Sequence, residues 1–467
     1  MVTVAVVGGG IAGLAAAVRL RDRLGPAARI IVVEQSDRPG GKLHTGSLAG
    51  VTAERGADAF LAREAGGTGE SAAVALAHRV GLGDQLVHPA PLPAGLALAG
   101  SLRPLPAGTL LGVPGDLDRL VGVARVPPGQ DPDGGGPVLA PGADVGVGAL
   151  VRRRLGDEVA DRLVEPMLGG VYAGRADELS LAATMPGLAA ACRTEPTLVG
   201  AVRAALAAAP RPAGTPVFAG VRGGMSRLVE AVAAASGATL RLGRPVRALA
   251  PDPAGPGWWL VVGSTRDAER VLADAVVLAV PARPASRLLA GVDPAAASPV
   301  GQLDYASVAL VTLALPGPVE LPEWTGFLVP AGERTAVKAV TFLTRKWPHL
   351  AGPERPVLVR ASVGRYRDEQ PLRHTDPALV ELVRAELDRW LGGRLPEPLA
   401  AGVQRWGGAL PQYAPGHLDR VAAARAALPG TLALAGAGYD GVGIPACIRS
   451  GQAAADTVAA ALEQSTV

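Results

Sequence analysis

The chain of 467 residues is 49% hydrophobic and 19% charged, which is typical of a globular protein with about two or three domains. Its 45 basic and 42 acidic residues give a net charge of +3, and the 3% of aromatic residues argues against a surface that stacks nucleic-acid bases. No run of about 18 residues is continuously apolar, so no transmembrane helix is predicted. Cys192 and Cys447 are too few and too far apart for a disulfide framework, which favours the reducing cytoplasm.

A dinucleotide-binding fingerprint opens the chain. An apolar strand at residues 4–7 is followed by a G-x-G-x-x-G turn, a helix over residues 14–23 and a second strand over 29–33 that ends at Glu34. Gly10 leaves room for a pyrophosphate, the helix N-terminus attracts its charge, and Glu34 accepts hydrogen bonds from a ribose. The turn consists of Gly8, Gly9, Gly10, Ile11, Ala12 and Gly13.

Two further stretches favour FAD over a nicotinamide cofactor. Residues 34–42 (EQSDRPGGK) continue from the strand-terminal acid into R-x-G-G, and residues 54–60 (ERGADAF) contain a second glycine turn. Both stretches resemble flavin-binding parts of the amine oxidase and phytoene desaturase superfamily.

The elements that follow alternate between nucleotide-domain patterns and inserted segments. Helices are predicted at 72–82, 145–173, 179–209, 376–391 and 445–462, and another opens near residue 220 and ends near 236. Strands are predicted at 239–242, 246–250, 258–262, 275–280, 305–315, 355–363 and 431–435. Residues 127–141 are rich in Pro and Gly and are predicted to form an exposed loop that tolerates deletion of residues 128–136.

Several other kinds of site are not indicated. The six histidines form no H-x-x-x-H pair and do not lie near a cysteine at ligand spacing, so no metal site is predicted. A P-loop and a G-x-S-x-G elbow are both missing from the sequence, which argues against NTPases and against hydrolases of that type.

Three later stretches narrow the resemblance. They are residues 163–174 (LVEPMLGGVYAG), residues 346–349 (KWPH) with 405–413 (RWGGALPQY), and residues 435–448 (AGAGYDGVGIPACI). With the N-terminal motifs, in this order from residue 1 to about 460, they resemble the protoporphyrinogen/coproporphyrinogen oxidases, especially the soluble bacterial coproporphyrinogen III oxidases. The G-V-G-I-P segment is the most specific of these pieces.

This resemblance implies an α/β fold with a discontinuous FAD-binding Rossmann-like domain of the amine oxidase/hydroxybenzoate hydroxylase type. It also implies a mixed-sheet substrate domain and an inserted helical domain. The expected ranges are 1–88, 211–290 and 405–467 for the FAD-binding parts, 89–210 for the helical insertion and 291–404 for the substrate domain.

The resemblance also implies which residues contact non-covalent FAD and the substrate. Besides the first glycine turn, the expected flavin contacts are Glu34, Gln35, Lys42, Gly56, Ala57, Asp58, Ala59, Val246, Trp406, Val442, Gly443 and Ile444. Tyr172 and Arg175 are expected at the substrate cavity, and Lys338, Arg345, Lys346 and Arg405 are candidates for its carboxylates. No catalytic side chain is predicted, because the chemistry takes place at the flavin N5. Cys447 is expected to be a small buried residue without a bond to the flavin.

The implied activity is the oxidation of coproporphyrinogen III with O2 as acceptor, in haem biosynthesis. Protoporphyrinogen IX oxidation is the first alternative, followed by an amine oxidase or a carotenoid desaturase. A flavin-free escort or GDI-like binding protein is the alternative outside enzymes, although such proteins lose the nucleotide site that is intact here. A transient contact with ferrochelatase, the next enzyme of the pathway, is a further expectation.

Overall fold

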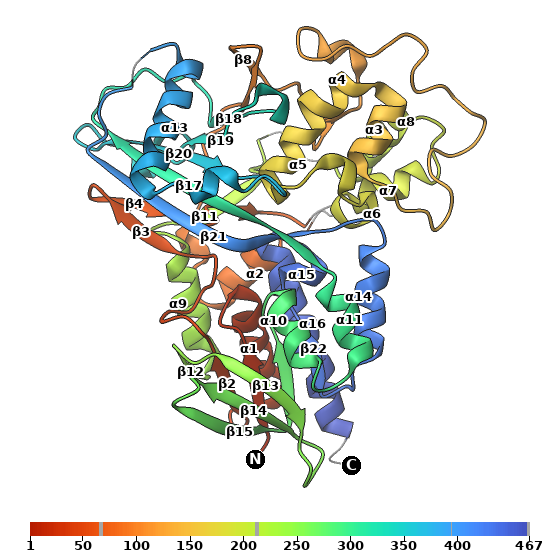
Figure 1. Cartoon of the computed structure of the whole chain (residues 1–467), viewed down its shortest axis with the longest axis vertical. Coiled ribbons are helices and arrows are strands. Elements are labelled where there is room, and N and C mark those ends of the chain that lie inside the picture. Colours follow the sequence, from red (N-terminus) through yellow and green to blue (C-terminus); the bar gives the residue numbers. More distant parts are fainter. Residues whose placement is uncertain (65–68, 211–213, 394, 465–467) are drawn as a thin grey trace.

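The computed structural model describes residues 1–64, 69–210, 214–393 and 395–464. A parallel sheet with its helices forms one half of the molecule, and a larger sheet lies across its top beside a group of helices (Figure 1). The fold is therefore mixed α/β, as predicted. Within the described ranges, no helix is both long enough and apolar enough to cross a membrane.

The parallel sheet is the core of the nucleotide-binding half. Alternate side chains of its strands enter two apolar clusters, one against α1 and α16 and the other against a three-stranded sheet and helices α10, α11 and α14. Its strand order is β12 (Thr239–Arg241), β2 (Arg29–Val33), β1 (Thr3–Val7), β16 (Ala275–Leu278) and β22 (Leu432–Leu434). The covering elements are α1 (Ile11–Leu24), α9 (Met225–Ser236), β13 (Val246–Pro251), β14 (Trp258–Gly263), β15 (Ala268–Ala273), α10 (Ala282–Leu289), α11 (Pro294–Gly301), α14 (His417–Ala426) and α16 (Ile444–Gln464).

Helices α1 and α16 are parallel neighbours. A Cβ at Gly451 would lie 2.0 Å from the carbonyl oxygen of Ala12, so the two backbones touch there. Further along, Arg19 pairs with Asp456 at 2.8 Å and Arg23 with Glu463 at 3.0 Å. Because both helices run in the same direction, their N-termini open at the same edge of the sheet.

The second sheet has seven strands and mixed directions. Helix α13 (Asp376–Leu391) packs on one face of this sheet through a shared apolar cluster, and Figure 1 shows it above the strands. The strand order is β21 (Ala400–Gln412), β17 (Asp304–Leu315), β20 (Val357–Val363), β19 (Val337–Phe342), β18 (Gly326–Leu328), β7 (Gly95–Leu98) and β8 (Ser101–Pro104).

This sheet differs from the expected domain ranges in two places. Strands β7 and β8 lie within the stretch 89–210 that was predicted as a helical insertion, and β21 crosses the expected boundary at residue 404. β7 and β8 are four-residue strands, too short to give a clear alternating pattern, and β21 pairs with β17 along almost its whole length. The ranges of the domains stay a prediction.

The remaining helices pack around one apolar cluster beside the large sheet. They are α3 (Val147–Leu155), α4 (Asp157–Val159), a π-helical turn (Ala160–Val164), α5 (Glu165–Tyr172), α6 (Leu181–Thr184), α7 (Pro186–Cys192) and α8 (Leu198–Ala208). Small elements complete the described fold: β3 (Thr45–Leu48), β4 (Val51–Glu54), β5 (Phe60–Leu61), α2 (Ala72–Arg79), β6 (Leu86–Val87), β9 (Thr109–Leu110), β10 (Val113–Pro114), β11 (Phe218–Val221), α12 (Leu343–Lys346) and α15 (Ala437–Asp440).

The Pro/Gly-rich stretch 127–141 is an exposed loop, as predicted, but two of its parts are tied to the neighbouring helices. The Asp131 carboxylate accepts the amides of Leu198 and Val199 at 2.8 and 2.9 Å and thereby caps α8. Val138 and Leu139 are buried among the helices. A deletion of 128–136 would remove Asp131 and its bonds to α8, so we expect it to destabilise the protein, unlike the tolerance that the composition suggested.

Candidate functional site

In the glycine turn after β1, two glycines are required by close packing and a third borders open space. A Cβ at Gly8, whose φ is +108°, would lie 2.4 Å from the carbonyl oxygen of Ala279, and one at Gly13 would lie 2.0 Å from that of Gly8. A Cβ at Gly10 would meet nothing within 4 Å. Gly10 therefore borders open space beside the first, unpaired amides of α1, which is the arrangement that a pyrophosphate requires.

The Glu34 carboxylate, at the end of β2, is oriented by three donors. Its Oε2 accepts the Gly9 amide at 2.7 Å, and its Oε1 accepts the amide and hydroxyl of Ser36 at 2.8 and 2.7 Å. A carboxylate offers about four acceptor positions, so one remains for a ribose hydroxyl. Gln35 is exposed beside it, and the segment leading into Val246 reaches the same edge because the Arg244 amide donates to the Glu34 carbonyl at 2.9 Å.

The R-x-G-G segment is fastened to the glycine turn. The Arg38 guanidinium donates to the carbonyls of Pro39, Gly41 and Leu43, and the Gly40 amide donates to the Gly9 carbonyl at 2.7 Å. Lys42 follows this segment, and burial lowers the pKa of its ammonium.

Residues 55–59, here called the 55–59 loop, contact Lys42 and Trp406. The Trp406 Nε1 donates to the Arg55 carbonyl at 2.7 Å, and the Ala57 amide donates to the Lys42 carbonyl at 3.3 Å. A Cβ at Gly56 would lie 1.8 Å from that same carbonyl, so glycine is required by the close backbone approach. Three predicted flavin contacts from distant parts of the chain are therefore neighbours.

The Asp58 carboxylate, in this loop, receives three donors, which come from the end of α12, from the residue after α12 and from β20 of the large sheet. Lys346 Nζ and Trp347 Nε1 reach its Oδ2 at 2.8 and 3.0 Å, and Arg360 reaches its Oδ1 at 2.8 Å. Burial alone would raise the pKa of Asp58, but the charges of Arg360 and Lys346 hold it well below its usual range. Lys346 is thus engaged with Asp58, and its expected role toward a substrate carboxylate stays a prediction.

The Val442–Gly443–Ile444 segment lies at the start of α16, where the N-terminus of that helix opens beside that of α1. The amide of Cys447 donates to the Gly443 carbonyl at 2.9 Å, which begins the helical bonding. Burial raises the pKa of the Cys447 thiol to about 11, so the thiol is neutral near pH 7 and is a poor nucleophile. Free helix-terminal amides here suit a negatively charged group.

Lys338 lies on the face of the large sheet that is turned away from α13. A β-bulge in the pairing of β19 with β20 occurs at this residue, and Lys338 Nζ donates to Ser362 Oγ at 2.6 Å. Ser362 and Arg360 alternate with residues of the α13-facing cluster, so both share the face that reaches the 55–59 loop. Lys338 is 3% exposed, and burial, with the charge of Arg365, lowers its pKa to about 7.

Helix α5 packs over β18 and β19 and brings the E-P-M-L-G-G segment to this face. Glu165 accepts the Ala331 amide at 3.2 Å, and burial raises the pKa of its carboxyl. Tyr172, at the end of α5, is buried against Tyr413 with ring centroids 5.6 Å apart, and burial raises its pKa to about 12.

The other basic candidates lie elsewhere. Arg175 is exposed after α5, and Arg345 donates to the Leu321 carbonyl at 3.0 Å in the segment after β17. Arg405 pairs with Asp376 at the start of α13 and donates to the His374 carbonyl at 2.6 Å. Arg405 therefore lies on the α13 side of the sheet, and its expected role toward a substrate carboxylate stays a prediction.

Sequence reasoning missed Arg360 and Ser362, the residues that organise this face. Both stand in the strand VLVRASV, which was predicted from its apolar residues. A signal was present, because a lone arginine in an otherwise apolar strand is rarely buried without a partner. The identity of that partner, Asp58, lies 302 positions away in the sequence and could not be deduced.

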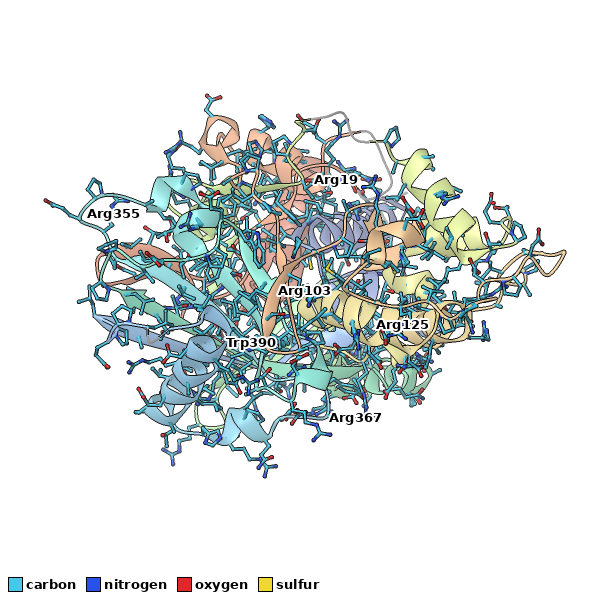
Figure 2. The ribbon with its side chains drawn as sticks, turned by 90° about the horizontal axis from the view of Figure 1, so that it is seen from above. Arg19, Arg103, Arg125, Arg355, Arg367 and Trp390 are labelled. Carbon is cyan, nitrogen blue, oxygen red and sulfur yellow. The ribbon has the colours of Figure 1, made fainter. Side chains whose placement is uncertain are left out.

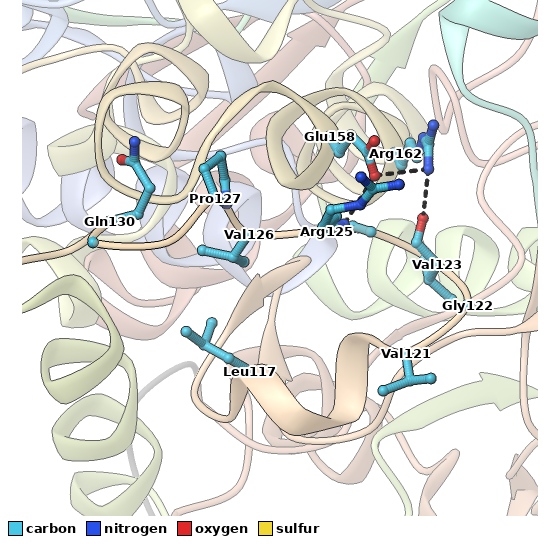
Figure 3. Close-up of a pocket in the computed structure, with 12 residues that line it drawn as sticks. Leu117, Val121, Gly122, Val123, Arg125, Val126, Pro127, Gln130, Glu158 and Arg162 are labelled. Carbon is cyan, nitrogen blue, oxygen red and sulfur yellow. Dashed lines mark hydrogen bonds and ion pairs between the residues drawn. The ribbon is translucent and has the colours of Figure 1, made fainter.

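A large surface pocket lies outside all of these residues. It occupies about 640 Å³ and is formed by residues 117–130 with Glu158 and Arg162 (Figure 3). Glu158 accepts the Arg125 amide and the Arg162 guanidinium, each at 2.9 Å, and Arg162 also donates to the Val123 carbonyl. These bonds hold the rim of the pocket together, and none of its residues belongs to the predicted site.

Comparisons with known proteins agree with this geometry. Residues 11–459 match the family described as flavin containing amine oxidoreductase. The chain is 37% identical to a coproporphyrinogen III oxidase of Mycobacterium tuberculosis over 98% of its own length and 97% of the relative, and 32% identical to that of Bacillus subtilis over 97% and 96%.

Solved structures give the same result. A putative protoporphyrinogen oxidase from Exiguobacterium superposes with a TM-score of 0.84 at 30% identity, covering 98% of this chain and 99% of the other. Cyclohexylamine oxidase from Brevibacterium oxydans shares the fold, with a TM-score of 0.68 at 19% identity over 99% of each chain. The chain therefore belongs to the flavin-containing amine oxidoreductases, in the FAD-dependent family of coproporphyrinogen and protoporphyrinogen oxidases.

Proposed function

We propose that this protein oxidises coproporphyrinogen III to coproporphyrin III in haem biosynthesis, removing six electrons with O2 as acceptor and releasing H2O2. The observation that carries the proposal is the match, over nearly the whole chain, to relatives named coproporphyrinogen III oxidase. In balanced form, three O2 become three H2O2 as six hydrogens leave the porphyrinogen. A cytoplasmic location and a contact with ferrochelatase stay predictions.

The chain's own residues would hold FAD along the shared edge of the parallel sheet. The pyrophosphate would occupy the open space at Gly10, the ribose would bond to Glu34, and the 55–59 loop, Trp406 and the start of α16 would surround the ring. Bound FAD supplies hydride acceptance at its N5. The helix-terminal amides of α16 would stabilise negative charge, since they carry the positive end of the helix dipole.

Lys338 would anchor one substrate carboxylate on the sheet face. It is buried, its ammonium donates to the neutral Ser362 hydroxyl, and it shares its face with Arg360 at the 55–59 loop. A buried ammonium is stabilised by an anion, and a propionate supplies one. Tyr172 would border the same region from α5, and neither residue is required to transfer a proton.

A direct assay with both porphyrinogens tests the function. The purified protein, mixed anaerobically with coproporphyrinogen III or protoporphyrinogen IX and then exposed to O2, is expected to form porphyrin fluorescence faster from the tetracarboxylate. Equal H2O2 and O2 turnover would accompany it. Faster turnover of the dicarboxylate would instead favour protoporphyrinogen oxidase, the name of a rice chloroplast relative that is 29% identical. Oxidation of amines but neither porphyrinogen would refute the proposal.

The flavin site is tested by a pair of glycine variants. Gly10→Val is expected to fold without FAD, since its side chain would enter open space where the pyrophosphate binds. Gly187→Val is the control, because a Cβ there also meets nothing within 4 Å but the residue is exposed in α7. A fully flavinated Gly10→Val would refute the assignment.

FAD attachment is tested separately. Because the Cys447 thiol is buried and its pKa is about 11, we expect acid precipitation to leave a colourless pellet and a yellow supernatant. Flavin that stays in the pellet and is released by Cys447→Ser would contradict non-covalent binding.

A further inference from the structure

Arg360 makes contacts that no residue motif predicted. Its side chain is buried in β20, and its NH1 donates to the carbonyls of Glu54 and Gly56 at 3.3 and 3.2 Å. Its NH2 donates to Asp58 Oδ1 at 2.8 Å. One planar guanidinium therefore spans three alternate positions of the segment that enters and forms the 55–59 loop.

These contacts differ from those of Lys346, the other cation at Asp58. Lys346 reaches the Asp58 carboxylate and lies over the Trp347 ring at 5.4 Å, whereas Arg360 also holds the backbone on either side of Arg55. A rigid fork that bonds to two carbonyls and a carboxylate fixes the course of a backbone, which a single ammonium does not do. Arg360 thus determines the shape of the loop, while Lys346 balances charge.

The same strand connects this loop to the substrate candidate. Ser362, two residues beyond Arg360 on the same face, accepts Lys338 Nζ at 2.6 Å. Two residues of a strand span about 7 Å, so the spacing between the loop and the Lys338 ammonium is set by a rigid element. A shift of the loop relative to the sheet would change the position of the flavin relative to a substrate held at Lys338.

We propose that Arg360 is a positioning residue. It holds the 55–59 loop in place against the flavin ring and thereby keeps the flavin and the substrate at a fixed separation. The expected effect on kinetics rests on the proposed function, and the expected effect on the flavin spectrum rests on the FAD of the family. It acts through the backbone of the loop, and Arg360 itself need not touch the substrate.

Three variants test the proposal: Arg360→Gln, Arg360→Lys and, as the matched comparison at the same carboxylate, Lys346→Gln. We expect Arg360→Gln to lower kcat by about tenfold or more, the usual effect of losing hydrogen bonds from a charged group, with KM changing less than about threefold. Its bound flavin should show a shifted visible band and a changed fluorescence. Arg360→Lys should recover part of kcat and spectrum, and Lys346→Gln should keep the wild-type flavin spectrum.

FAD titration of the apo-proteins distinguishes a misplaced flavin from a missing one, because kcat can then be expressed per bound flavin. A wild-type spectrum and kcat per flavin in Arg360→Gln would overturn the proposal, as would an equal spectral change in Lys346→Gln. If Arg360→Gln fails to fold, Arg360→Lys carries the same comparison, since it keeps a cation at Asp58. If the wild type oxidises neither porphyrinogen, the proposed function fails, while the spectra and FAD dissociation constants still decide the role of Arg360.

Discussion

Two buried charges at one face of the large sheet, Asp58 in the 55–59 loop and Lys338 in β19, have opposite surroundings. Asp58 receives donors from Lys346, Trp347 and Arg360, whereas Lys338 donates to one neutral hydroxyl, that of Ser362. Accordingly, the pKa of Asp58 lies well below its usual range and that of Lys338 falls to about 7. The first group is satisfied within the protein and stabilises the fold, while the second gains from an added anion, as a binding residue does.

The largest expected effect comes from removing the satisfied charge. Asp58→Ala leaves Lys346 and Arg360 buried without their carboxylate, which should destabilise the protein by about 3–5 kcal/mol. Denaturant unfolding measures this loss of stability. Asp267→Ala is the control, because its pair with Arg244 is at the surface and its side chain is 75% exposed, and it should cost at most about 1 kcal/mol. Equal losses in both variants would contradict the distinction.

Removing the unsatisfied charge should instead affect binding. Lys338→Met replaces a buried ammonium by an apolar side chain of similar size, so the free energy of unfolding should stay equal or rise. The KM for coproporphyrinogen III should increase by about tenfold to a hundredfold, since a charge-assisted bond is lost. Arg355→Met is the control, because Arg355 projects from the surface in Figure 2. An unchanged KM with a large loss of stability would make Lys338 a structural residue.

A third buried carboxylate extends the comparison to backbone donors. Asp131→Ala removes two acceptors for the first amides of α8, where Thr197 remains as the N-cap, and a contact with Arg154, and it should cost about 1–2 kcal/mol in unfolding free energy. Asp133→Ala, in the same stretch but exposed, should change stability by less than about 0.5 kcal/mol. If both variants unfold with wild-type midpoints, the stretch is the free loop that its composition suggested.

The smallest expected effect is on the pH dependence of the free energy of unfolding. The Lys338 pKa is about 7 in the folded protein against 10.5 ordinarily, so between these values the unfolded chain holds a proton that the folded protein has released. Stability should therefore rise with pH across this window by more in the wild type than in Lys338→Met. Substrate binding needs the ammonium, so KM in the wild type should increase above about pH 7. Parallel pH profiles of the two proteins would contradict the shifted pKa.

The sequence by itself determined the nucleotide-binding edge. The glycine turn, the strand-terminal Glu34 and the R-x-G-G segment lie within about 40 residues, and their geometry follows from local rules for turns, helix N-termini and strand ends. All five strands of the parallel sheet and α13 were predicted as well. β15, an edge strand of the three-stranded sheet, was not, because its exposed edge carries polar residues that give no apolar pattern.

Tertiary structure alone decided which charges meet. Asp58 and Arg360, 302 residues apart, are joined because β20 passes over the 55–59 loop, and Lys338 reaches Ser362 through a bulge that no periodicity marks. Lys346 and Arg405 looked equivalent to Lys338 in the sequence, but ion pairs with Asp58 and Asp376 occupy them. The charge of a side chain follows from its residue type, whereas its partners depend on contacts between segments that are distant along the chain.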